Sequence, residues 1–328
     1  MSDLIVLRPE GLYCPAGDFY IDPHKRVTRA VVTHAHGDHA RSGCARYWTA
    51  EPGYRLLKTR LGAAAQIKPQ AYGEAFELGG VRVSFHPAGH ILGSAQVRIE
   101  VGGEVWVVSG DYKRDDDPSC APFEVVRCDT FVTETTFAAP QYVWPPSGNA
   151  SAEIHQWWMA NRADGFASVL FCYALGKSQR VLAELLRHVA DPQTTVYLHE
   201  TMTRLVGHYR RAGIAMLPTA PVNECVRSHD FRGALILVPP QAFGTPWLKR
   251  LAPYRTGFAS GWMGADNGRA ARYDRGFTMS DHADWPSLLR TIDETGARRI
   301  LTMHGDSALL VELLRARGLQ AEALDLQH

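Results

Sequence analysis

Short apolar runs separated by turn residues dominate the first 140 residues of the chain. Runs of this length, rich in valine, isoleucine and phenylalanine, are typical of strands that are buried on at least one face. The pair Gly102-Gly103 lies between two of them and predicts a hairpin. One longer segment, at 52–66, has a helical pattern. The predicted strands lie at 4–7, 19–21, 30–32, 81–85, 97–100, 105–108 and 131–133.

The pattern changes at about residue 142. Strands predicted at 169–171, 195–198 and 235–238 alternate with helical segments that begin near 151, 176 and 202. This alternation is typical of an α/β domain built on a parallel sheet. Residues 257–264 are predicted to form a flexible turn, and 287–295 and 299–303 a helix and a strand. We therefore expect a first domain at 1–140, an insert at 141–265 and a completing part at 266–328.

Composition narrows the classes of protein only slightly. The 328 residues are 45% hydrophobic and 21% charged, with a net charge of +1, which gives no overall attraction to nucleic acid. The six cysteines form no Cys-x-x-Cys pair, so free thiols are expected rather than a disulfide framework. We see no signal peptide and no apolar run near the ~18 residues that a membrane helix needs. The sequence therefore predicts a cytoplasmic protein with no membrane contact.

Three histidines and an aspartate follow the strand at 30–32 within six residues. Imidazole and carboxylate groups are the ligands that zinc prefers. We expect His34 and His36 to face one ion, and Asp38 and His39 to face a second, with Gly37 allowing a tight turn between the two pairs. The sequence therefore predicts a metal site on this loop.

Matching ligands follow three later strands. His90 lies among small residues after strand 81–85, Asp111 follows strand 105–108, and His304 follows strand 299–303. We expect His34, His36, His90 and Asp111 to hold one ion, and Asp38, His39, His304 and Asp111 to hold the other. The ions would be zinc, with manganese as a possibility, and open coordination would remain for a water.

Other polar residues allow two interpretations each. Asp22, followed by a proline, either hydrogen-bonds a metal-bound histidine or simply forms a turn. The basic residues of the middle segment form either a nucleic-acid-binding face or a solvated helix surface. Gly176-Lys177-Ser178 resembles the end of a phosphate-binding loop, but Phe171 stands where that motif requires glycine, which excludes it. The basic residues concerned are Lys177, Arg180, Arg187, Arg204, Arg210 and Arg211.

The His-x-His-x-Asp-His motif, with a later Gly-His and Gly-Asp, resembles the metallo-β-lactamase superfamily. Three further features resemble its β-CASP nucleases, the group that contains Artemis and the nuclease that cleaves pre-messenger RNA: Glu134 in Thr-Glu-Thr-Thr, an inserted α/β domain, and two late histidines, His282 and His304. Tyr-Ala-Leu-Gly-Lys-Ser-Gln-Arg and Ser-Gly-Trp-Met look most like the bacterial ligase-associated DNA exonucleases. The resemblance covers nearly the whole chain.

This resemblance implies an α/β fold, a metallo-β-lactamase αββα sandwich with an inserted β-CASP-like α/β domain. It implies a DNA exonuclease of a repair pathway that activates water between two metal ions and acts on single-stranded or frayed DNA. A DNA ligase and a helicase would be its partners. His282 would be the general acid, held by Glu134, and Asp38 would belong to the catalytic group. The residues expected to contact phosphates are Lys177, Arg180, Arg269, Arg272 and Arg275.

Three alternatives remain open. A histidine at position 304 is typical of RNA-processing members, although the bacterial DNA group also tolerates it, so an RNA-cleaving enzyme is one alternative. The absence of added RNA-binding domains favours DNA. A small-ester or thioester hydrolase would not need a long insert, and a non-catalytic scaffold would not need every ligand to be present.

Overall fold

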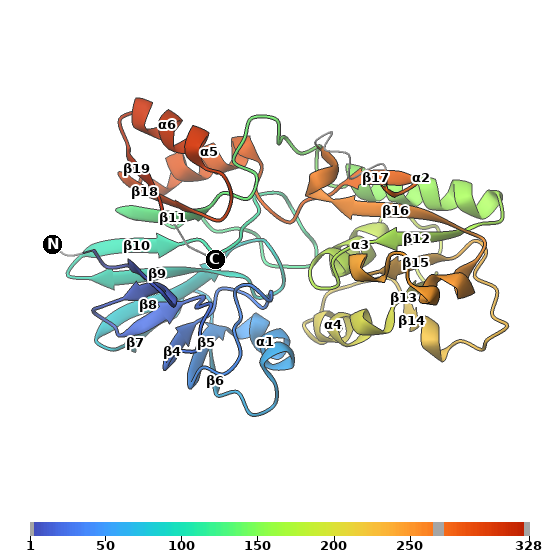
Figure 1. Ribbon diagram of the computed structural model, residues 1–328, viewed down its shortest axis with the longest axis horizontal. Coiled ribbons are helices and arrows are strands. Elements are labelled where there is room, and N and C mark those ends of the chain that lie inside the picture. Colours follow the sequence, from blue (N-terminus) through green and yellow to red (C-terminus); the bar gives the residue numbers. More distant parts are fainter. Residues whose placement is uncertain (1–2, 265–271, 325–328) are drawn as a thin grey trace. The chain divides into compact units, whose positions relative to one another are not determined.

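The chain forms two compact units in the computed structural model, which describes residues 3–264 and 272–324 (Figure 1). The first unit consists of Met1–Arg114, Cys120–Tyr142 and His282–His328, and the second of Asp115–Ser119 and Val143–Asp281. The second unit thus extends past the boundary expected at residue 265, because the strand at Arg275–Thr278 pairs with Tyr254–Ser260 in its sheet. The assignment of domains to 1–140, 141–265 and 266–328 stays a prediction.

The first unit is built on two sheets. One sheet has the order β1-β2-β3-β4-β5-β6 and the other β19-β18-β11-β10-β9-β8-β7. The strands of the first sheet are β1 (Val6–Arg8), β2 (Gly11–Cys14), β3 (Phe19–Ile21), β4 (Arg29–Val31), β5 (Arg46–Ala50) and β6 (Ile67–Gln70). The strands of the second are β7 (Ala75–Leu78), β8 (Val81–Pro87), β9 (Ala95–Val101), β10 (Glu104–Val108), β11 (Thr130–Glu134), β18 (Arg299–Met303) and β19 (Gln320–Ala323).

Helices complete the layers of this unit. The short turn η1 (Glu51–Gly53) leads into α1 (Tyr54–Leu61), beside β5 and β6, while α5 (Trp285–Thr295) and α6 (Ala308–Ala316) cover the outer face of the second sheet (Figure 1). One apolar core, which includes Phe19, Phe85 and Trp106, fills the space between the sheets. A second core lies between the second sheet and α5 and α6. The order of layers is therefore helix, sheet, sheet, helix.

The second unit is an α/β unit on one parallel sheet, in the order β14-β13-β15-β12-β16-β17. Its strands are β12 (Ala167–Phe171), β13 (Val196–Leu198), β14 (Thr219–Pro221), β15 (Leu235–Val238), β16 (Tyr254–Ser260) and β17 (Arg275–Thr278). Its helices are α2 (Asn149–Ala163), α3 (Lys177–Leu185) and α4 (Glu200–Arg211), with the short turns η2 (Val222–Glu224), η3 (Pro240–Ala242), η4 (Pro246–Leu251) and η5 (Gly261–Gly264).

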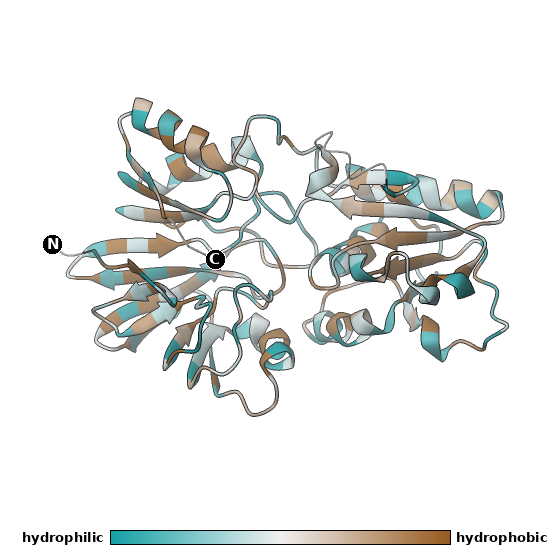
Figure 2. Ribbon diagram, in the orientation of Figure 1, coloured by the Kyte–Doolittle hydropathy of each residue, from teal (hydrophilic) through white to brown (hydrophobic). Residues whose placement is uncertain are grey.

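The two faces of this parallel sheet are covered differently. The helices α2, α3 and α4 pack on one face, and loops with the 3₁₀ turns η2, η3 and η4 cover the other. The central strands β12 and β15 are buried along their whole length and are drawn almost entirely in brown in Figure 2. Continuous apolar strands are expected where both faces of a parallel sheet are covered.

The predicted α/β class is confirmed: the first unit is a helix–sheet–sheet–helix sandwich, and a parallel-sheet unit is inserted into it. Some local expectations were wrong. The helix expected at 52–66 is shorter, because Gly62, with φ of +93°, ends it. Of the residues expected to form a turn at 257–264, the first half belongs to β16 and the second half forms the short turn η5. Among the described residues, no helix has both the length and the apolar character needed to cross a membrane.

Candidate metal centre

The loop after β4 is fixed by contacts of Thr33, the residue that precedes the first histidine. The backbone N–H of Thr33 donates to Asp22 Oδ1 at 2.8 Å, and the Thr33 carbonyl accepts from Ala95 on β9 at 3.0 Å. Gly110 lies against the Thr33 side chain, where an added Cβ would come within 2.7 Å of it. The end of β4 is therefore held between the neighbouring strand β3 and residues of the second sheet.

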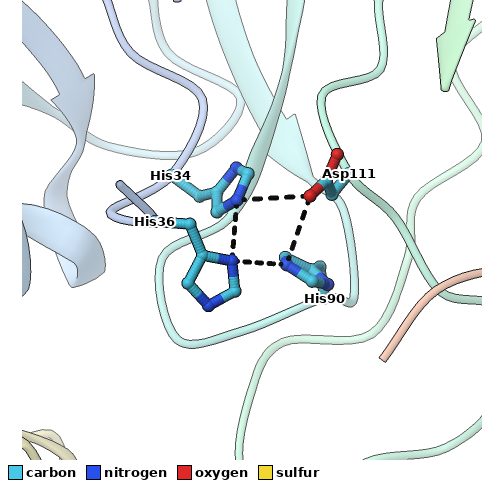
Figure 3. A group of neighbouring side chains, drawn as sticks. All are labelled: His34, His36, His90 and Asp111. Carbon is cyan, nitrogen blue, oxygen red and sulfur yellow. Dashed lines mark hydrogen bonds and ion pairs between the residues drawn. The ribbon is translucent and has the colours of Figure 1, made fainter. Parts of the chain in front are cut away.

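Four side chains converge at this point: His34, His36, His90 and Asp111 (Figure 3). The nitrogen pairs His34 Nε2···His36 Nδ1 and His90 Nε2···His36 Nδ1 are 3.0 and 3.1 Å apart. Oδ2 of Asp111 lies 3.5 Å from His34 Nε2 and 3.7 Å from His90 Nε2. A tetrahedral zinc site with bonds of about 2.05 Å has ligand-to-ligand edges of about 3.3 Å. These donors therefore fit one zinc-sized ion.

The protonation states of His34 and Asp111 suit metal binding. Burial, and then the neighbouring His39, hold the pKa of His34 well below 6.5, so His34 is neutral at neutral pH. Burial alone would raise the pKa of Asp111. The electrostatic attraction of the carboxylate to His39 and His282 outweighs the effect of burial and holds that pKa well below 3.8. A neutral imidazole and an ionised carboxylate are the forms that bind metal.

A second group of donors faces the other oxygen of Asp111. His39 Nε2 lies 3.4 Å from Asp111 Oδ1 and 3.7 Å from Asp38 Oδ2. The His304 ring is 5.3 Å from the His39 ring, centre to centre. Asp38, His39 and His304 line a cavity of about 330 Å³, together with His24 and Arg41 among others. Asp111 thus has Oδ2 toward His34 and His90 and Oδ1 toward His39. The second ion, and the bridging role of Asp111, stay predictions.

Asp22 contacts the Nδ1 atom of His39. Its Oδ2 lies 2.7 Å from His39 Nδ1 and accepts a further hydrogen bond from the Thr33 hydroxyl. Burial would lower the pKa of His39, but Asp111 and Asp22 outweigh it and raise that pKa well above 6.5. A carboxylate on Nδ1 fixes the tautomer that leaves Nε2 toward Asp111. The contact is the one expected of a residue that orients a metal-bound histidine.

Glu134, the last residue of β11, holds His282. Nδ1 of His282 lies 2.9 and 3.0 Å from the two carboxylate oxygens of Glu134. Glu134 also accepts from the Tyr112 backbone N–H at 2.8 Å and from the Thr136 hydroxyl at 2.6 Å. Asp111, Glu134 and His282 could themselves offer ligand atoms to an ion. Because four groups, including the Thr136 backbone N–H, already donate to Glu134, we expect it to accept hydrogen bonds rather than to bind an ion.

His304 follows β18 in an unusual backbone conformation, with φ of +58°. Its carbonyl accepts from the Thr135 backbone N–H at 3.1 Å and from the Thr135 hydroxyl at 2.8 Å. Burial, and then His39, lower the pKa of His304, which favours the neutral ligand form. Thr135 was not among the predicted site residues. Its only signal in the sequence is its place directly after Glu134.

The expectation that Lys177 and Arg180 lie on an exposed basic face was wrong. Both side chains are buried, at 2% and 5% exposure, and form ion pairs inside the second unit. A buried and paired cation cannot exchange counterions at a phosphate. Arg272 is exposed, with its guanidinium 4.1 Å above the Phe243 ring. Arg269 lies outside the described residues.

The chain is similar to several curated proteins. A protein named "Probable DNA ligase" from Opitutus terrae is 34% identical over 318 residues, which is 96% of this chain and 30% of that protein. "Transcription termination factor FttA" from Methanosarcina mazei is 30% identical over 48% of this chain and 28% of its own length. "Endoribonuclease YSH1" from Gibberella zeae is 32% identical over 29% of this chain and 12% of its own length. No protein-family model matches.

A solved structure shares the fold. The crystal structure of a protein of unknown function from Enterococcus faecalis superposes with a TM-score of 0.62, over 90% of this chain and 78% of that one, at 13% identity. With the ligand motifs and the geometry of the site, the likenesses to the curated proteins identify the chain as a member of the β-CASP group of the metallo-β-lactamase superfamily. The chain spans less than a third of the length of these curated relatives.

Proposed function

We propose that this chain hydrolyses phosphodiester bonds in DNA as an exonuclease of DNA repair, with two divalent ions at its histidine and aspartate groups. The observation that carries the proposal is Asp111, whose two oxygens face separate groups of histidines. Two ions about 3.5–4 Å apart are typical of sites that hydrolyse phosphate esters. A small-ester hydrolase or a scaffold would leave the inserted unit or the complete ligand set without a use.

The donor groups would divide between the two ions. His34, His36 and His90 would hold one ion, Asp38, His39 and His304 the other, and Asp111 both. Bound there, zinc or manganese would supply Lewis acidity and a water nucleophile of lowered pKa. Asp22 keeps His39 oriented by accepting from Nδ1. Asp38 has a side chain that is 75% exposed, so it is the ligand we expect to move most on binding.

His282 is proposed as the general acid. Glu134 accepts a hydrogen bond from Nδ1 of His282. The proton on the other ring nitrogen, Nε2, is therefore the one available to the departing sugar oxygen. The His282 ring also lies 4.7 Å from the ring of His90, a proposed metal ligand. His282 is therefore close enough to the proposed ions to reach the same substrate.

DNA is the substrate that the likenesses favour. A relative that matches nearly the whole chain is named a probable DNA ligase, whereas one named an endoribonuclease matches 29% of it. Because the chain matches only part of a protein named for ligation, we also propose that it works beside a DNA ligase. RNA is the second candidate, supported by that endoribonuclease and by His304.

The proposal is tested with purified protein, zinc or manganese, and end-labelled single-stranded and duplex DNA and RNA of the same sequence. We expect progressive shortening of DNA, fastest on single-stranded or frayed ends, and loss of activity after chelation. An Asp111→Ala preparation, which should lose all hydrolysis, controls for contaminating nucleases. Cleavage of RNA alone would replace DNA by RNA, and no cleavage of either would refute the proposal.

A further inference from the structure

A buried charge network lies in the second unit and is not explained by metal binding. Lys177 and Arg180 stand at the first and fourth positions of α3, and both side chains are almost completely buried. Their acidic partners, also buried, are Asp117, Glu184 and Asp281. Burying charges costs several kcal/mol per ion even when they are paired, so such a network is weak evidence for stability alone.

The two cations contact three consecutive residues. Lys177 Nζ lies 2.8 Å from Asp281 Oδ1 and donates to the Met279 carbonyl at 2.5 Å. Arg180 donates to the Ser280 carbonyl and lies 3.5 Å from the same Asp281 oxygen. About one hundred residues of sequence separate α3 from this segment. The network therefore fixes the backbone and the side chain of the short strip Met279–Asp281.

The next residue is His282. On its other side, the Ala283 backbone N–H donates to the Tyr112 carbonyl at 2.7 Å, and Asp284 caps α5 by accepting from the Ser287 N–H. The chain is therefore held directly before and directly after the proposed general acid. The Glu134 contact alone fixes one ring nitrogen, but it leaves the backbone that carries the ring free to shift.

We propose that Lys177 and Arg180 are positioning residues for proton transfer by His282, acting through the Met279–Asp281 strip. This inference rests on the proposed function. Displacing a catalytic group by about 1 Å can lower the rate about 10²-fold. Loss of the contacts that hold this strip should therefore slow DNA hydrolysis by a measurable factor. Neither cation contacts the substrate in this role.

The test uses Lys177→Met, which keeps the length of the side chain and removes its charge. We measure kcat on DNA and on bis(p-nitrophenyl) phosphate, whose leaving group needs no protonation, together with bound metal and unfolding temperature. We expect a 10- to 100-fold loss of kcat on DNA, nearly full activity on the activated diester, and two metal ions still bound.

Two further variants separate positioning from folding. Asp281→Asn removes the carboxylate but leaves the backbone carbonyls, and it should show the same selective loss to a smaller degree, even if Lys177→Met fails to fold. Val206→Ala opens a cavity in the core of the same unit, on α4, and controls for a general loss of stability. It should leave the ratio of the two activities unchanged.

Several outcomes would overturn the inference: an equal loss on both substrates, no loss on either, or a loss confined to DNA binding with a flatter salt dependence. The last result would mean that Lys177 contacts phosphate after all. Failure of the proposed function looks different, because the unaltered protein would then hydrolyse no DNA at all.

Discussion

Asp111 is the single residue on which both proposed ions depend. Asp111→Ala should lose both metal ions and all hydrolysis, because it removes an oxygen from each group of donors at once. Metal content by mass spectrometry should fall from about two ions per chain to none, in line with a two-metal site. Asp293→Ala, which removes an exposed carboxylate on α5, is the control and should keep both ions. Normal activity in Asp111→Ala would exclude a bridging role.

The second prediction concerns His282, the proposed general acid held by Glu134. His282→Ala should keep two ions yet slow DNA hydrolysis by about 10²–10⁴-fold, the usual range for a lost general acid. Activity on a diester with an activated leaving group should largely survive, because that group departs without a proton. Metal titration and both rate measurements decide the point. Loss of metal, or equal slowing on both substrates, would assign His282 to the ions instead.

The parallel strands β11 and β18 bring together site residues that lie far apart in the sequence. Their register pairs Glu134 with Met303, so Thr135 comes opposite His304. Both Thr135 donors reach the carbonyl of His304, which is held at positive φ. Strain of this kind persists only when the surrounding structure maintains it. The end of this strand pair therefore determines where His304 points.

Thr135→Val tests this arrangement. Removing the hydroxyl should destabilise the chain by about 1–3 kcal/mol, because one buried hydrogen bond is lost and a carbonyl loses a donor. We expect weaker binding of the ion at His304 and unchanged binding at His34, His36 and His90, measured by competition with a metal-sensitive dye. Thr130→Val, the same change at the start of the same strand, is the control. If Thr135→Val bound the ion at His304 as tightly as the unaltered protein does, the prediction would be contradicted.

At the scale of the whole molecule, the proposed ions should stabilise only one unit. All of the proposed ligands lie in the first unit, and a ligand that binds only the folded state stabilises it by RT ln(1 + [L]/Kd), about 2.7 kcal/mol at a concentration of 100 Kd. Chelation should therefore lower the unfolding temperature of the first unit and leave that of the second unchanged. Calorimetry with a chelator, and again after zinc is restored, would measure both. A shift of both units by the same amount would mean that they unfold together.

Much of the proposed site could be predicted from the sequence because ligand chemistry is local. Histidines and aspartates that follow short apolar strands of one sheet share the edge at which those strands end. This holds for His90, Asp111 and His304, which follow β8, β10 and β18 of the second sheet, while His34 follows β4 of the first. The class of fold could be predicted for the same reason: the spacing of apolar residues reports whether a segment is half-buried, fully buried or helical. The individual roles of these residues stay predictions.

What the sequence could not determine depended on contacts between distant residues. Gly257 resembled a turn residue, yet it lies within β16, where a Cβ would come within 2.8 Å of the Phe277 ring. Lys177 resembled a surface charge, yet Asp281, more than one hundred residues later, pairs with it in the interior. Thr135 became a site residue only through the register of β11 with β18. The sequence by itself determined which chemistry is available at the strand ends. Only the tertiary structure decided which charges are buried and which backbone groups meet, because burial and pairing depend on neighbours that the order of residues does not specify.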